Sequence, residues 1–335
     1  MKYSCVQREF FKLKPFTPIH TICLQQVSLS SMQSLCWGDG AMSSFYEVAA
    51  GIYRLDVPFG GIWTGVLLVK GDQNILVDSG PDAQSVDTYL VPALHRMGLT
   101  LADISWLACT HCHGDHVGGH ARIRELADVK IAAFKGSKEH LEDPLRLNRA
   151  IRARFPEYSP SPSAGLRGVK PDRLMEDGET LGGFLRLIHT PGHDTDAVCW
   201  LDEHTSSLIT GDSLQMHGTK TQGIGLVMDL KGYLDSLEKL KAIPIKNILS
   251  GHPYLPLGAD AQGVQSVRAY LDECMACIDY YRAFLRFHWH SGEYDLATLA
   301  RMLIKACGGT VPDYLFLPLY TVSECLKYDG LKEKN

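Results

Sequence analysis

The chain has 335 residues, of which 45% are hydrophobic and 21% are charged, proportions that exclude a disordered or collagen-like protein. Its net charge of -5 comes without any block of like charges, so a nucleic acid or an anionic membrane is not expected as a partner. No apolar run approaches the roughly 18 residues of a membrane-spanning helix, and no secretory signal is visible, so we expect a cytoplasmic protein. Its ten cysteines lack a regular framework and indicate reduced thiols.

The first part of the chain lacks sustained periodicity. Residues 1–41 mix Ser, Gln, Cys and Pro, and we expect them to form a disordered extension. Patterning begins after Met42, which is therefore a candidate for the translation start. Beyond it, short runs rich in apolar and β-branched residues predict a series of strands. These runs cover residues 51–57, 65–69, 74–78, 104–110, 129–134, 184–190, 197–202, 207–211 and 245–250.

Helical patterns separate and follow these strands. Apolar residues at 3.6 spacing predict a helix over 230–243 that packs on a sheet. Residues 139–178 contain PEYSPSPSAG and few strand signals, which suggests an insertion that forms a lid or a wall of the site. Residues 262–335 form a predicted helical appendage, in which Asp295 can cap a helix and Gly308 can end it. The remaining part, 42–261, is predicted to be an α/β (α+β) catalytic domain with sheets inside and helices outside.

The strongest chemical signal is the run THCHGDH at 110–116, which follows an apolar strand and precedes a plausible helix. Because alternate side chains of an extended segment share a face, His111 and His113 can point at one metal ion. The chain can then turn at Gly114, so that Asp115 and His116 serve a second ion. An isolated histidine is usually a surface or satisfied core residue, but this density favours a metal site. Imidazole and carboxylate are the ligands of catalytic zinc, which leaves a position open for water.

Three more candidate ligands each follow a predicted strand and a glycine. They are His193 in HTPGHD, Asp212 in LITGDS and His252 in ILSGHP. Each alone would be a weak signal. A ligand at the end of a strand sits on a rigid support, and the preceding glycine permits a close backbone approach. Together with the run at 110–116, these residues predict one composite site.

This set of residues resembles the metallo-β-lactamase superfamily over roughly residues 45–260. The string His-x-His-x-Asp-His beginning at His111 carries the resemblance, and Asp78 in NILVDSG matches the structural aspartate of that family. The resemblance implies an αββα sandwich with the active site at one edge of its two sheets. It also implies the ligands of two metal ions: His111, His113 and His193 for one, and Asp115, His116 and His252 for the other, with Asp212 bridging them.

The implied activity is that of a dinuclear metal-dependent hydrolase acting on a small molecule. Two ions, zinc by expectation although iron or manganese also suit the ligands, would share a bridging hydroxide that attacks a thioester, ester or lactone. Asp115 and Asp212 would be the catalytic carboxylates, since each binds metal and Asp115 also orients the nucleophile. A homodimer is compatible with the sequence.

Several features leave the substrate and the reaction open. The lactone-cleaving branch commonly has a tyrosine three residues after the bridging aspartate, whereas this chain has Gln215. The glutathione-thioester branch uses basic residues from its C-terminal helices, for which Arg268, Arg282 and Arg286 are candidates, although a helical arginine is more often solvated. The alternatives are a metal-dependent ribonuclease or phosphodiesterase, or an oxidoreductase resembling the mono-iron persulfide dioxygenases. Flavodiiron proteins are disfavoured because they usually have Glu at the position of His113 and carry a flavodoxin domain.

Other cysteines and histidines have plain structural explanations. Alternation along the strand turns Cys112 away from the metal ions, so packing is favoured over a thiol site shared with Cys109. The pair Cys274 and Cys277 falls in a helical pattern without a second pair at zinc-site spacing, which also favours packing. For His120 and His189, hydrogen bonding to a ligand residue and an ordinary structural role are equally compatible with the sequence. Neither is assigned as a metal ligand.

Overall fold

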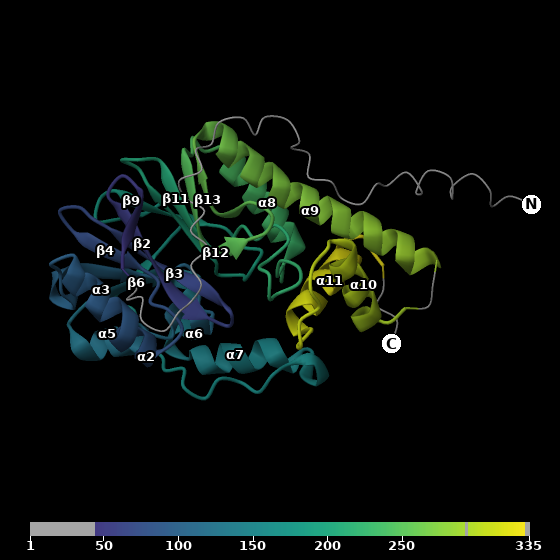
Figure 1. The fold of residues 1–335 in the computed structure, drawn as a ribbon, viewed down its shortest axis with the longest axis horizontal. Helices are drawn as coiled ribbons and strands as arrows, with labels where there is room; N and C mark the ends of the chain where they lie inside the picture. The colour runs from purple at the N-terminus through teal and green to yellow at the C-terminus, as the bar shows by residue number, and fades with distance from the viewer. Residues whose placement is uncertain (1–43, 292–293, 332–335) are drawn as a thin grey trace, which may run out of the picture.

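Alternating apolar residues build two mixed sheets that pack face to face. The computed structural model describes residues 44–291 and 294–331, so the predictions for residues 1–41 and for Met42 lie outside the described residues. Helices cover the outer surfaces of both sheets (Figure 1). The predicted αββα sandwich with C-terminal helices is therefore confirmed.

The first sheet has seven strands, which neighbour one another in chain order. Its first pairs are antiparallel and β4 to β7 are parallel. Its strands are β1 (Tyr46–Ala49), β2 (Ile52–Phe59), β3 (Ile62–Val69), β4 (Asn74–Val77), β5 (Ile104–Ala108), β6 (Lys130–Phe134) and β7 (Arg173–Met175).

The second sheet has six strands in the order β13-β12-β11-β10-β9-β8, with β11 and β12 parallel and the other pairs antiparallel. Its strands are β8 (Thr180–Leu181), β9 (Leu185–His189), β10 (Val198–Asp202), β11 (Ser207–Gly211), β12 (Asn247–Tyr254) and β13 (Gly258–Gln262). Every predicted strand is present in the two sheets. The strands β1, β7, β8 and β13 were not predicted.

The period-two alternation of a strand decides which layer each side chain enters. In β4, Ile75 and Val77 face the core between the sheets, whereas Leu76 joins the layer under the helices of the first sheet. In β10, Trp200 enters the core between the sheets, while Cys199 points toward the helices of the second sheet. Three apolar layers therefore separate the four layers of backbone.

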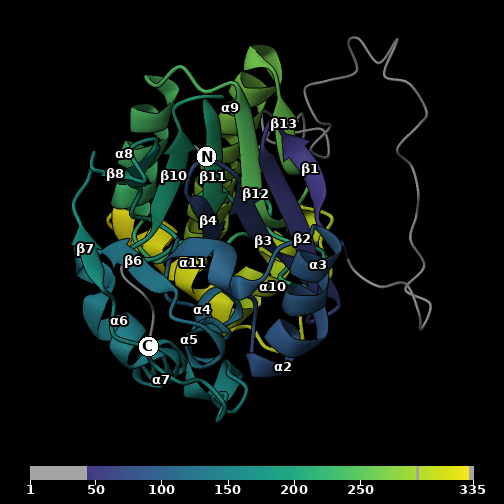
Figure 2. The same cartoon turned by 90° about the vertical axis from the view of Figure 1, so that its left-hand side faces the viewer.

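Each outer face is covered by its own set of helices, as the turned view shows (Figure 2). The first sheet is covered by α2 (Ala83–Ser85), η1 (Val86–Leu90), α3 (Val91–Arg96) and α5 (His120–Leu126). The second sheet is covered by α8 (Leu230–Lys241) and α9 (Val264–Ser291). The side chain of Asp229 caps α8 by accepting from the Gly232 N–H at 3.1 Å. The predicted helix is therefore present, and it ends at Lys241, two residues before the predicted end at Ile243.

The C-terminal helices are α9, α10 (Leu296–Ala306) and α11 (Phe316–Tyr328). Asp295 caps α10 by accepting from the Thr298 N–H at 2.6 Å, and Gly308 follows the helix with a φ of 75°, as predicted. Buried residues of these helices and of the second sheet belong to one apolar cluster. The division of the chain at residue 262 stays a prediction.

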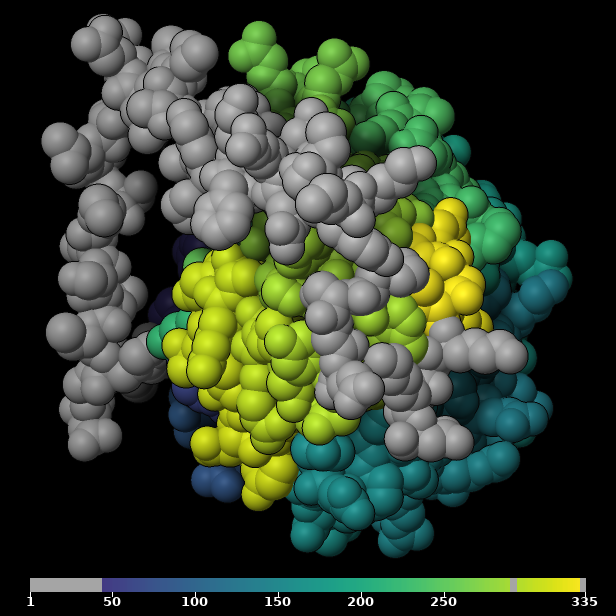
Figure 3. All heavy atoms as spheres, turned by 90° about the vertical axis from the view of Figure 1, so that its right-hand side faces the viewer, coloured from purple at the N-terminus to yellow at the C-terminus, as the bar shows by residue number. Residues whose placement is uncertain are grey.

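The segment 139–178 contains α7 (Pro144–Ala153) and, at its start, most of α6 (Lys138–Glu142). It packs on α11, because the Tyr320 hydroxyl donates to the Ile151 carbonyl at 2.9 Å and the Tyr320 ring meets Phe155 edge-on. Figure 3 shows the C-terminal helices, in yellow-green and yellow, meeting the teal segment on one face of the molecule. Among the described residues, no helix has the length and apolar character needed to cross a membrane.

Candidate metal centre

The loop that carries the metal-site motif is fixed by a buried aspartate. Asp78 follows β4 and has a positive φ of 63°, an uncommon conformation for a residue other than glycine. Its carboxylate accepts from the Thr110 N–H at 2.9 Å and from the Thr110 hydroxyl at 2.7 Å. The segment after β5 is thereby held against the end of β4. The motif then enters the short helix α4 (Gly114–Val117), which carries Asp115 and His116.

The other candidate ligands come from the second sheet. His193 follows β9 and Asp212 follows β11 directly, as predicted, whereas His252 lies inside β12, which extends beyond the predicted strand end at residue 250. Tight backbone approaches accompany them. A Cβ atom on Gly211, whose φ is +48°, would lie 2.5 Å from Oγ1 of Thr110. The two sheets therefore meet closely at this edge.

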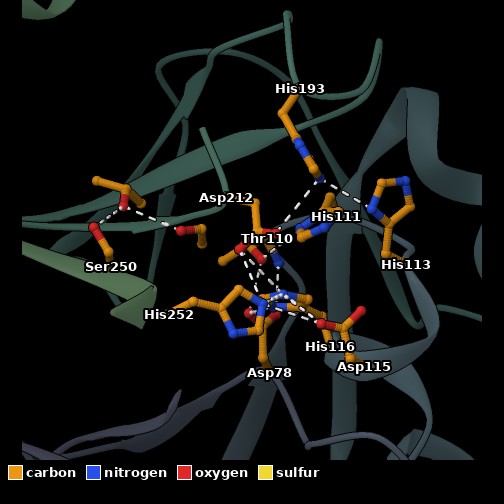
Figure 4. Close-up of polar contacts among 12 residues, drawn as sticks. Asp78, Thr110, His111, His113, Asp115, His116, His193, Asp212, Ser250 and His252 are labelled. Atoms are coloured by element: carbon orange, nitrogen blue, oxygen red, sulfur yellow. Dashed lines mark hydrogen bonds and ion pairs between the residues drawn. The ribbon is translucent and has the colours of Figure 1, made fainter. Parts of the chain in front are cut away.

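The first group of candidate ligands consists of His111, His113 and His193, whose ligand atoms all lie within 4.8 Å of one another. Nε2 of His193 lies 3.0 Å from Nδ1 of His113. His111 and His193 are 1% and 2% exposed, so their rings are shielded from solvent. Figure 4 shows these rings turned toward a common point.

The second group consists of Asp115, His116 and His252, again with ligand atoms within 4.8 Å. Nε2 of His252 lies 3.1 Å from Oδ2 of Asp115 and 3.3 Å from Nε2 of His116. Asp212 lies between the two groups (Figure 4). Its Oδ1 is 3.2 Å from Nε2 of His116, and its Oδ2 is 3.6 Å from Nε2 of His193. All seven predicted ligands are thus gathered at one place.

Three histidines of this cluster have an Nε2 atom that can bind a metal ion. Nδ1 of His116 lies 2.8 Å from Oδ2 of Asp78, and Nδ1 of His252 lies 2.7 Å from the Trp63 carbonyl oxygen. Each of these oxygen atoms accepts a hydrogen bond from Nδ1–H, so Nε2 of each ring carries a lone pair. The two Nε2 atoms face each other. Nε2 of His111 is also buried, without a hydrogen-bond partner among the described residues. This donor set fits a pair of divalent metal ions.

The electrostatics of the cluster keep its carboxylates ionised. Burial raises the pKa of Asp115, but His116 and His252 more than offset this and hold that pKa at about 2. The pKa of Asp212 is likewise far below its usual value, because the neighbouring histidines outweigh its burial. Burial lowers the pKa of His193 to about 4. Burial also lowers the pKa of His116, but the surrounding carboxylates overcome this and raise it. A cation must therefore displace protons held by some of these rings.

One carboxylate near the cluster was missed by the sequence reasoning. Oδ2 of Asp194 lies 3.2 Å from Nε2 of His113, which leaves Nδ1 of that ring directed at His193. Asp194 is 3% exposed and its other carboxylate oxygen accepts from the Thr195 N–H at 2.6 Å. The signal was the aspartate directly after His193 in HTPGHD. A carboxylate beside a ring nitrogen orients a ligand histidine in many metal sites.

Gln215 takes part in the cluster in place of the tyrosine expected of a lactone-cleaving enzyme. Its side-chain Nε2 donates to Oδ2 of Asp212 at 3.2 Å and lies 2.9 Å from Nδ1 of His193. Its Oε1 accepts from the Leu226 N–H at 2.7 Å. Gln215 is 1% exposed, so its amide holds Asp212 and His193 in position and is buried away from a substrate. It also lacks the hydroxyl that a tyrosine would supply.

The thiols flanking the motif point away from the cluster. Sγ of Cys109 donates to the His111 carbonyl at 3.1 Å, and Sγ of Cys112 lies 3.6 Å from the Ser137 carbonyl oxygen. The hydrogen bond with Cys112 and burial raise the pKa of the Cys109 thiol well above its usual value. Both thiols are packing residues, as alternation indicates.

The remaining cysteines and histidines named from the sequence also lie outside the two groups. Cys274 and Cys277 are fully buried in the helical layer, within α9. Nδ1 of His120 lies 2.8 Å from the Ser79 hydroxyl, and Nε2 of His189 lies 3.0 Å from the Thr195 carbonyl oxygen.

The arginines suggested for glutathione binding do not reach the site. Arg282 and Arg286 pair with Asp329, at 2.6 and 3.5 Å, and neither they nor Arg268 line the cavity over the cluster. These candidates are therefore not supported: Asp329 pairs with Arg282 and Arg286, and Arg268 is exposed, in line with the more common solvated role of a helical arginine.

A cavity of about 320 Å³ opens over the two groups of ligands. Asp115, His193, Asp212 and His252 form its floor together with His113. Its walls come from the turn between β2 and β3, from α7 and the loop after it, from residues 219–226, and from the start of α11. A substrate of moderate size can therefore reach the predicted ligands.

Comparison with curated proteins gives relatives of the same kind. The chain is 30% identical over 197 residues to the lactamase-like protein aptB of Emericella nidulans. The matched region covers 59% of this chain and 50% of that protein. It is 26% identical over 173 residues to the atrochrysone carboxyl ACP thioesterase of Passalora fulva, covering 51% of this chain and 42% of that one. The chain therefore spans about half the length of these relatives.

Solved structures share the fold. A β-lactamase domain protein from Burkholderia ambifaria superposes with a TM-score of 0.67 at 19% identity, covering 89% of this chain and 91% of that chain. The family model of the metallo-beta-lactamase superfamily matches residues 60–252, a range that begins between β2 and β3 and ends at the last candidate ligand. The fold, the clustered histidines and aspartates, and this match agree, and the chain belongs to the metallo-β-lactamase superfamily.

Proposed function

We propose that the protein is a dinuclear metal-dependent hydrolase, with zinc as the resident metal, that cleaves a thioester or related ester. The observation that carries the proposal is the position of Asp212 between two complete groups of three ligands. One group would hold an ion through His111, His113 and His193. The other would hold an ion through Asp115, His116 and His252.

The surrounding residues prepare these ligands. Asp78, Asp194 and the Trp63 carbonyl each engage the outer nitrogen of a ligand histidine, so the inner nitrogen keeps its lone pair. Divalent ions bound by these residues would supply Lewis acidity and lower the pKa of bound water toward about 7. Because water is the nucleophile, no serine or cysteine is needed, in keeping with the buried, high-pKa thiols beside the motif.

Asp115 is the residue we assign to orienting the attacking water. Its side chain reaches the cavity and keeps a pKa of about 2, so it stays ionised and accepts a hydrogen bond at neutral pH. Asp212 stays ionised for the same reason and would tie the two halves of the centre together. These two carboxylates are the catalytic residues of the proposal.

The cavity favours an acyl substrate over a polyanion. Apolar side chains from α7, the following loop and α11 form much of its wall, and among its described lining residues only Arg152 is a lysine or arginine. A nuclease would need a basic groove along the nucleic acid backbone. The relative from Passalora fulva is named a thioesterase, which supports thioesters as the first class to test. Gln215 in place of a tyrosine argues against lactones.

The decisive test combines metal analysis with a substrate panel. Protein purified without added metal is analysed for zinc, iron and manganese and is assayed with thioester, lactone, β-lactam and phosphodiester substrates. We expect two ions per chain and preferential thioester cleavage, which is lost with a chelator and restored by zinc. A single iron with oxygen consumption would instead indicate a persulfide dioxygenase, and preferential phosphodiester cleavage would indicate a nuclease.

A further inference from the structure

Arg152 lines the cavity without an anionic partner among the residues that the structure describes. Arg152 lies on α7 and faces the same cavity as Asp115 and His252. Asp115 and Asp212, the carboxylates that line this cavity, both belong to the metal centre. Arg152 forms no ion pair with any carboxylate in the described part of the chain, whereas Arg154 two residues later pairs with Glu324.

The surroundings of Arg152 hold its guanidinium in place without neutralising it. One terminal nitrogen donates to the Asn148 carbonyl at 3.0 Å, and the guanidinium lies 5.2 Å from the centre of the Phe316 ring. Its Nε is buried and has no hydrogen-bond partner among the described residues. Burial lowers the pKa of Arg152, but a guanidinium remains charged at neutral pH. Its remaining donors are therefore available to an anionic oxygen group.

Apolar side chains make up part of the cavity wall that Arg152 shares with the metal centre. Leu147, Ile151 and Leu166 line it together with Phe316 and Leu317 of α11. A hydrocarbon segment of a substrate that packs against these side chains would be stabilised, because its apolar surface leaves water. The planar fork of an arginine matches a carboxylate or a phosphate.

We propose that Arg152 binds an anionic oxygen group of the substrate, so that the enzyme prefers acyl substrates with an apolar middle and a negatively charged end. This inference rests on the proposed hydrolase function and adds a specificity residue to it. The anion has two sources with the same chemistry. It is either a carboxylate at the far end of the acyl chain or a phosphate on the leaving group.

The test compares an uncharged thioester with two thioesters that carry an anion at opposite ends. The octanoyl and 7-carboxyheptanoyl thioesters of N-acetylcysteamine share a chain length, and octanoyl-coenzyme A places phosphates on the leaving group instead. We expect wild-type kcat/KM to be about 10- to 100-fold higher for one of the two charged substrates than for the uncharged one, as a charge-assisted hydrogen bond allows. The preferred substrate identifies which end carries the anion.

The variants separate binding of the anion from a structural role. Arg152→Met keeps an unbranched stem against Phe316 and should reduce the preference ratio to about one, and Arg152→Lys should restore part of it because the charge remains. A merely structural role would lower turnover of charged and uncharged substrates equally and leave the ratio intact. Arg149→Met, on the exposed side of α7, is the matched control and should behave as wild type.

A binding measurement keeps this inference separate from the proposed reaction. The amide analogues of the same three compounds lack the scissile thioester, and calorimetry gives their dissociation constants with the metal-loaded protein. A preference for a charged amide that Arg152→Met removes supports the inference even if no thioester is cleaved, a result that would count against the proposed function alone. Equal binding of charged and uncharged amides by wild type, or a preference that survives in Arg152→Met, would overturn it.

Discussion

Oδ2 of Asp78 lies 2.8 Å from Nδ1 of His116, across 38 residues of chain. The contact fixes the proton on Nδ1 and leaves Nε2 free for a metal ion. We expect Asp78→Asn to place an amide N–H opposite Nδ1 and to favour the other tautomer. Zinc affinity should fall by about 10- to 100-fold. A competition titration against a chromophoric chelator measures it, with Asp87→Asn, an exposed partner of Arg122, as control. Unchanged affinity would contradict this role of Asp78.

Asp212 faces both groups of ligands, so its removal should affect both ions at once. We expect Asp212→Ala to lower kcat by at least about 100-fold and to reduce the metal content from two ions per chain to one or fewer. Plasma mass spectrometry on protein of known concentration gives the metal content. Full turnover in a variant that still carries two ions would show that Asp212 does not bridge.

Gly251 has no room for a side chain. A Cβ atom there would lie 2.8 Å from Oδ1 of Asp212 and 2.8 Å from Cε1 of His116. We expect Gly251→Ala to displace both side chains, so that metal content and activity fall while the far-ultraviolet circular dichroism stays close to wild type. Gly263→Ala is the control, because a Cβ atom at Gly263 would meet no atom within 4 Å, although the φ of this residue is positive. It should keep its metal content and activity. A fully active, fully loaded Gly251→Ala protein would disprove the steric argument.

His120 should make the folded state sensitive to acid. Burial lowers its pKa to about 3, below the usual value of 6.5, so the unfolded chain binds a proton that the native state does not between these values. The unfolding free energy therefore falls as pH drops from 6.5 toward 3, by about 1.4 kcal/mol per pH unit from this group. Urea titrations of metal-free protein at several pH values measure the slope. In His120→Gln the contribution of His120 to the slope of unfolding free energy against pH should be absent. A slope identical to that of wild type would show that His120 does not cause the acid sensitivity.

Sequence patterns were sufficient where apolar residues dominate a strand. The runs that became β3, β4, β6 and β10 could be predicted for that reason. The short strands β7 and β8 are too brief to show a period, and β13 has the small and polar sequence GADAQ. Such strands form because a neighbouring strand offers its backbone, a tertiary effect that local propensity does not contain.

The candidate ligands were predictable because four of them are crowded into the run THCHGDH, and the other three each follow a glycine near the end of an apolar run. Their partners were less visible. The Trp63 carbonyl that holds His252 is a main-chain group, so no residue type marks it. Asp194 and Arg152 are single charged residues whose meaning depends on a neighbour far away in the sequence. Geometry was needed to find them.

The placement of the ligands on both sheets has a consequence for maturation. His116 and His252 are 136 residues apart in the chain, yet their Nε2 atoms lie 3.3 Å apart. Neither half of the sandwich contains all the candidate ligands, so we expect a nascent chain to bind metal weakly until β12, which carries the last of them, has docked. Metal binding would then require that both halves have assembled, and the bound ions would stabilise the assembled sandwich against unfolding.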